Sequence, residues 1–201
     1  MRVHSAVDIA QINRFKRVVI QTAKLPTFIH HEWFIKYHLR LVECISLESC
    51  ALYPRADRNL VLLLVWFHDY GKIIDIHHEH EATYAAGKEK LLELGFPLAL
   101  VRKVVQYSTI FDNKTSIKQA PIEVQIVSSA DGAAHLIGPF YALYWKEHNN
   151  QPYKNLMEEN KRKGLVDWNQ KIVLPEVKKA FLSRHKLLLE HCGVFPKAFL
   201  S

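Results

Sequence analysis

The chain has 201 residues, of which 49% are hydrophobic and 23% charged, and this composition suits one globular domain and excludes a disordered chain. Twenty-seven Lys and Arg against 20 Asp and Glu give a net charge of +7, which favours an anionic partner or substrate. Three cysteines without a CxxC pair indicate neither a disulfide framework nor a thiolate zinc site. We expect a cytoplasmic protein without a membrane span, because the N-terminus lacks a signal pattern and the longest apolar run, 60–67, is too short for a bilayer.

The first third of the chain predicts three helices. A basic amphipathic helix covers about 8–24, and a second helix covers about 31–52. Asp57 or Asn59 can cap a third, very apolar helix, which we expect to end where Gly71 offers a left-handed stop.

The rest of the chain also has helical periodicity and few strand signals. A polar, histidine-rich loop is expected first, followed by three helices, a segment of mixed signals and a final basic helix. These stretches lie at about 73–80, 81–94 (ended by Gly95), 97–108, from Pro121 onward, 140–170 and 175–191. The sequence therefore predicts an all-α fold in one domain, 1–201, with a bundle core at about 31–138 and a helical appendage at 139–201 packed on it.

Ionisable side chains interrupt the apolar faces of two of these helices. His38 lies one turn before Leu41 and Val42 on the same stripe, so we expect it to point inward. His68 and Asp69 end the most apolar helix of the chain. Each has a plain structural interpretation: a core histidine bonded to a carbonyl, or a histidine at a helix C-terminus. That second interpretation does not account for Asp69, because a carboxylate at a helix C-terminus is electrostatically misplaced.

A third helix repeats the pattern with Asp131, which shares a stripe with Val124, Val127 and Ala134. Alone it could be an internal cap or the partner of an arginine. Buried carboxylates cost several kcal/mol unless they are paired, protonated or bound to a metal. Two imidazoles and two carboxylates together form a donor set that suits a divalent first-row ion such as Mn, Fe, Co, Ni or Zn.

These residues resemble the HD superfamily of metal-dependent phosphohydrolases. The likeness rests on His38 in FIKYHLRLVE, the doublet His68-Asp69 in LVWFHDYGK and Asp131 in SSADGAAHL, and it covers about 31–138. It implies an all-α HD bundle in which His38, His68, Asp69 and Asp131 hold a metal. It also implies that Lys72, in the HDxGK position, contacts the substrate phosphate.

Two further histidines receive roles from the same resemblance. His80 takes the place of a family histidine that serves a second metal or the substrate, and the segment 104–110 lacks the histidine that often follows it. We therefore expect one tightly held metal, with His80 acting on the substrate or its leaving group. His135, one turn after Asp131, could orient a ligand or line the substrate pocket.

The sequence-based hypothesis is a metal-dependent phosphohydrolase, a monoesterase or a diesterase, that acts on a nucleotide or a related small phosphorylated metabolite. Asp69, Lys72 and His80 are its candidate catalytic residues, and Lys72, His80 and His135 its candidate substrate contacts. The alternative is a catalytically weak HD-fold protein that binds a nucleotide or nucleic acid in a regulatory role. HD-type oxygenase chemistry is less favoured, since it normally requires two irons and more histidines. A homodimer is compatible with the apolar helix faces at both ends of the chain.

Overall fold

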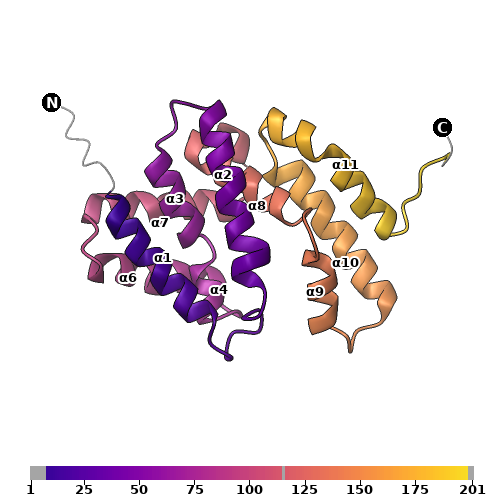
Figure 1. Cartoon of the computed structure of the whole chain (residues 1–201), viewed down its shortest axis with the longest axis horizontal. Helices are drawn as coiled ribbons and strands as arrows, with labels where there is room; N and C mark the ends of the chain where they lie inside the picture. Colours follow the sequence, from indigo (N-terminus) through magenta and orange to yellow (C-terminus); the bar gives the residue numbers. More distant parts are fainter. Residues whose placement is uncertain (1–7, 115, 199–201) are drawn as a thin grey trace.

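A computed structural model describes residues 8–114 and 116–198, and within these ranges the chain is helical with no strand (Figure 1). The all-α prediction is confirmed. None of the helices in the described ranges combines the length and the apolar character needed to cross a membrane.

Helix α1 (Ile9–Ala23) matches its prediction closely. The Asp8 side chain accepts a hydrogen bond from the Ala10 N–H at 2.9 Å and so caps the helix. Its apolar stripe is buried against α3 and α4.

The second predicted helix starts later than its periodicity suggests. Turns occupy 24–33, and the helix begins with a π-helical turn, η1 (Ile35–Leu39), which continues as α2 (Arg40–Leu52). The turns are held by tertiary contacts, since Trp33 Nε1 donates to Glu147 at 2.6 Å and the Trp33 ring packs on Phe140. The predicted start at residue 31 was wrong because these partners lie more than a hundred residues away.

Helix α3 (Arg58–Phe67) begins as predicted, with Asp57 accepting from two backbone N–H groups at 3.1 Å. It ends earlier than predicted, and a short helix, α4 (Tyr70–Ile74), follows the doublet. Gly71 is not a left-handed stop, because it lies inside α4 and has no positive φ. Position 71 needs glycine because the chain packs closely there: an added Cβ would lie 2.0 Å from the carbonyl oxygen of Glu79.

The remaining core elements follow the predicted order. They are α5 (Glu79–Ala82), the π-helical turn η2 (Thr83–Gly87), α6 (Lys88–Glu93), α7 (Leu98–Asp112), the short η3 (Ile117–Gln119) and α8 (Ile122–Ala134). Gly95, with φ of 79°, ends α6 as predicted. Helix α8 is the central element, because every residue from 126 to 134 is buried.

The segment of mixed signals folds into α9 (Phe140–Glu147), α10 (Tyr153–Val166) and the π-helical turn η4 (Asp167–Lys171), and α11 (Pro175–His191) follows. In Figure 1, α9, α10 and α11 lie together on one side of α2 and α8. Two serines of α8 attach η4: Ser128 Oγ donates to the Lys171 carbonyl at 3.1 Å, and Ser129 Oγ accepts from the Val173 N–H at 3.0 Å. These bonds fix η4 against the central helix.

Candidate metal centre

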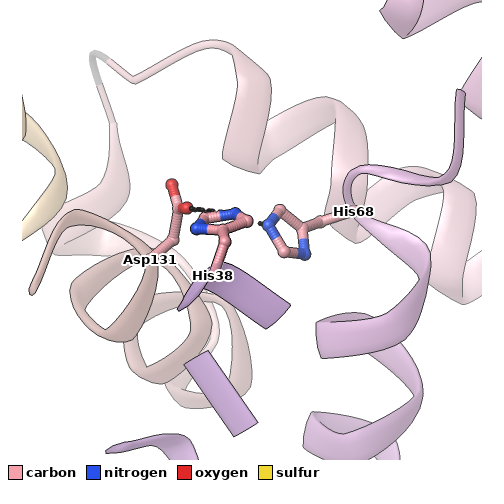
Figure 2. Close-up of side chains that lie close together, drawn as sticks. All are labelled: His38, His68 and Asp131. Atoms are coloured by element: carbon pink, nitrogen blue, oxygen red, sulfur yellow. Dashed lines mark ion pairs between the residues drawn. The ribbon is translucent and has the colours of Figure 1, made fainter. Parts of the chain in front are cut away.

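Three of the four predicted metal ligands meet inside the bundle. His38 comes from η1, His68 from the end of α3 and Asp131 from α8, and Figure 2 shows their side chains reaching toward one another from separate helices. One ligand atom from each lies within 4.8 Å of the others. Their exposed fractions are 1%, 6% and 2%. The position of His38 in a π-helical turn is typical of functional sites.

Asp69 lies against the same group. Its Oδ2 is 3.0 Å from His38 Nε2 and 3.4 Å from His68 Nε2, and Asp131 Oδ1 is 3.4 and 3.7 Å from the same two nitrogens. Donor atoms about 2.1 Å from one ion stand about 3.0 to 4.2 Å apart, according to whether they are cis or trans. The four separations fall in this range and are compatible with a shared ion, and His38, His68 and Asp131 form the group whose ligand atoms all lie within 4.8 Å of one another.

His68 supplies the most direct evidence for a cation. Its Nδ1 donates to the Val65 carbonyl at 2.8 Å, so in the neutral form of the ring Nε2 carries the lone pair. This Nε2 is buried and has no hydrogen-bond partner among the residues that the structure describes. A lone pair facing two carboxylates is repelled by them unless a proton or a metal ion lies between. Burial alone would lower the pKa of His68, but Asp69 and Asp131 raise it, so the site attracts positive charge.

A lysine holds the outer oxygen of each carboxylate. Lys72 Nζ donates to Asp69 Oδ1 at 2.9 Å, and Lys171 donates to Asp131 Oδ2. Each aspartate therefore turns its other oxygen toward the histidines. Burial alone would raise the pKa of these carboxyls, but Lys72 and Lys171 hold the pKa of both well below its usual range. Both aspartates are thus ionised and oriented for one-oxygen coordination.

His135 is held beside the same centre by the C-terminal segment. Its Nδ1 lies 2.8 Å from Asp167 Oδ2, its Nε2 lies 3.5 Å from Asp131 Oδ1, and its ring stacks on His38. Burial and the charge of Lys163 lower the pKa of His135 to about 4, so the ring is neutral near pH 7. The Asp167 contact favours a proton on Nδ1 and leaves Nε2 as an acceptor.

Sequence reasoning missed three charged residues of this site, namely Lys163, Asp167 and Lys171. They repeat every four residues through the end of α10 and η4, and that spacing places them on one helix face. Lys163 Nζ lies 3.4 Å from Asp167 Oδ2. The spacing was visible in the sequence, but nothing there distinguished it from a solvated face.

His80 lies apart from the ligand group. Its Nδ1 is 3.1 Å from Asp112 Oδ2, the same oxygen that accepts a 2.5 Å hydrogen bond from Tyr84. Half of the His80 side chain is exposed. Its predicted action on the substrate stays a prediction.

A cavity of about 270 Å³ opens onto the centre between the core and the helices α9 and α10. It brings together His38, Lys72 and His135, three of the predicted site residues. Aromatic residues, among them Trp33, Phe140 and Tyr144, also line the cavity. The other charged residues of its wall come from the core and from α10. The charged ones are Glu79, Glu159, Arg162 and Lys163.

Comparisons of this chain with models of protein families, with curated proteins and with solved structures gave no significant match.

Proposed function

We propose that this protein is a metal-dependent phosphohydrolase of the HD type. The observation that carries the proposal is the convergence of His38, His68, Asp69 and Asp131 around the unpartnered Nε2 of His68. Its substrate is a phosphate ester of a nucleotide or a related small metabolite. Mixed nitrogen and oxygen donors suit one divalent ion of the series Mn, Fe, Co, Ni and Zn.

When bound, such an ion would make a hydroxide nucleophile available near neutral pH and neutralise charge on the phosphoryl oxygens. The protein residues have separate tasks. Lys72 lies on the cavity wall beside Asp69 and can donate to a phosphate oxygen as charge moves onto it. His135, neutral and held by Asp167, can accept a hydrogen bond from the attacking water through Nε2.

The outer oxygens of the two ligand carboxylates are occupied by Lys72 and Lys171, so they are poorly placed to take the proton of the water. This arrangement favours His135 as the acceptor over Asp69 or Asp131. His80 could protonate the leaving oxygen, with Asp112 orienting its ring.

The cavity wall supports a nucleotide or another substrate with a flat apolar group. Trp33 and Phe140 meet edge to face at 5.5 Å, and Tyr144 lines the same space. Aromatic faces of this kind accept a base by stacking. The cations Lys72, Arg162 and Lys163 suit the phosphate end.

The test is a hydrolysis screen over a panel of nucleotides and sugar phosphates, with metal-stripped protein supplied with one ion at a time. We expect activity with one substrate class that is abolished by chelator and restored by the ion. Asp69→Ala should lose both the bound metal and the activity. Equal metal content and equal activity in wild type and variant would refute the proposal.

A further inference from the structure

A second cavity, the C-terminal cavity, lies among α9, α10 and α11 and has a volume of about 620 Å³ (Figure 1). It is a neighbour of the cavity at the candidate metal centre, because His135 and Tyr141 line both. None of the four candidate metal ligands lines it. Sites for small molecules have volumes of about 300 to 1,000 Å³, so the C-terminal cavity is large enough for one ligand.

The walls of the C-terminal cavity are largely apolar and aromatic. Trp145 of α9 and Tyr153 of α10 meet edge to face at a ring separation of 5.9 Å, and Leu187 and Leu188 line the cavity from α11. Tyr153 is 65% exposed and Leu187 is 51% exposed, so apolar surface of these walls is in contact with water. A flat apolar group that enters the cavity would cover this surface and pack against the aromatic rings.

The packing behind these walls fixes their shape. An added Cβ at Gly164 of α10 would lie 2.6 Å from Leu188 Cδ2 and 3.7 Å from Tyr141 Oη, so α10 packs closely against two side chains of the cavity wall. On α11, the His185 ring stacks on Trp168 at 4.2 Å and attaches the helix to η4. The cavity is therefore preformed, as ligand sites commonly are.

The polar side chains of the walls are suited to a negatively charged group. Arg184 and His191 are seven residues apart and lie on the face of α11 that lines the cavity. The Nε1 of Trp145 and the Oη of Tyr141 are buried and have no hydrogen-bond partner within the described ranges. Among the described residues that line the cavity there is no Asp, Glu, Asn or Gln. The walls thus supply a positive charge and hydrogen-bond donors without a carboxylate to repel an anion.

We propose that the C-terminal cavity binds a small aromatic monoanion, such as an aromatic carboxylate, with its ring against Trp145 and Leu187 and its charge at Arg184. A nucleotide fits these walls less well, because the polar edge of its base would lose hydrogen bonds to water that the walls do not replace. This inference does not rest on the proposed function, and either can fail without the other.

The first test is calorimetry with 2-naphthoate and its uncharged analogue 2-naphthamide as probes. A charge-assisted hydrogen bond to Arg184 should make the wild type bind the acid about tenfold more tightly than the amide. Arg184→Met should bind the two probes with nearly equal affinity. Lys186→Met is the matched control, because it removes a charge from an exposed position on the same helix outside the cavity, and it should keep the tenfold preference.

Two results of this test would overturn the inference. One is no binding of 2-naphthoate to the wild type at millimolar concentration. The other is a preference for the acid over the amide that is absent from the wild type or unchanged in Arg184→Met.

The second test locates the aromatic ring. Leu187→Asp places a negative charge in the wall and should weaken binding of 2-naphthoate more than tenfold. Leu182→Asp is its control, because Leu182 is also exposed on α11 and does not line the cavity. Thermal unfolding of each variant verifies that it is folded. Equal affinity of the folded variants for 2-naphthoate would place the ring elsewhere and overturn the inference.

Two further measurements separate this site from other occupants. Affinity for 2-naphthoate should be the same before and after treatment of the protein with a chelator, and binding lost with the metal would place the anion at the metal centre. Wild type and Leu187→Asp should have equal masses by sedimentation, whereas a dimer that dissociates in Leu187→Asp would assign this face to a second copy of the chain. Either contrary result would overturn the inference.

Discussion

Binding of a divalent metal should stabilise this protein, and the effect should depend on His68. Within the described ranges its Nε2 has no hydrogen-bond partner and lies buried near two carboxylates, so its lone pair and their charges repel one another in the folded state. A metal ion bound between them would remove this repulsion and so raise the free energy of unfolding. A ligand at one hundred times its dissociation constant adds about 2.7 kcal/mol to the free energy of unfolding. For a chain of this size, that gain raises Tm by about 5 to 11 °C.

The perturbation is His68→Gln, which removes the coordinating nitrogen and keeps a polar side chain of similar length. If the variant binds the ion at least about a hundredfold more weakly, the same metal concentration adds about 0.4 kcal/mol and shifts Tm by about 1 or 2 °C. The assay is thermal unfolding of metal-stripped protein with and without Mn, Fe, Co, Ni or Zn.

His185→Gln is the matched control. His185 is as buried as His68 but stacks on Trp168, at a ring separation of 4.2 Å, away from the ligand group. Its loss should lower the starting Tm and leave the metal-induced shift intact. If none of the ions moves the Tm of the wild type, the cluster is a network of ion pairs with a proton on His68, and the metal centre is refuted.

Three further outcomes follow from the structure. Lys171→Met leaves Asp131 buried without its lysine and should lower the free energy of unfolding, measured by urea titration, by about 3 to 5 kcal/mol. Lys186→Met, at an exposed site, is the control, and an equal loss in both variants would contradict this prediction. If His80 protonates the leaving oxygen, His80→Asn should lower kcat by about 10² to 10⁴ for an alkyl phosphate and far less for p-nitrophenyl phosphate, whose leaving group needs no proton; equal losses would exclude that role. Burial, with a smaller effect of Lys178, lowers the pKa of His185 in the folded state. The unfolded chain therefore takes up more protons than the folded one below about pH 6.5, and the free energy of unfolding falls as the pH drops through that range. Unfolding curves at pH 7 and 5 should show a smaller decline for His185→Gln than for the wild type, and parallel declines would argue against this pKa shift.

The sequence alone predicted the helical class and most helix boundaries, because caps and stops are local. Asp57 bonds to N–H groups two and three residues away, and Gly95 ends α6 through its own φ. The burial of the candidate ligands His38, His68 and Asp131 was also predictable. A histidine or aspartate on an apolar helical stripe is expected to be buried, which costs free energy unless it is paired. This pattern is visible in the sequence without knowledge of the elements that pack against the helix.

Only the tertiary structure decided which residues surround that group. Lys163 and Lys171 lie in a polar stretch where regularly spaced lysines are indistinguishable from a solvated face. Two serine bonds, from Ser128 to Lys171 at the end of η4 and from Val173 just after it to Ser129, hold this face inward and bring Lys171 onto Asp131. Likewise, the turns at 24–33 depend on Glu147, far along the chain. A local sequence pattern predicts that a charged side chain will be buried and will need an oppositely charged or hydrogen-bonding partner. Which residue becomes that partner depends on how segments distant in the sequence pack together.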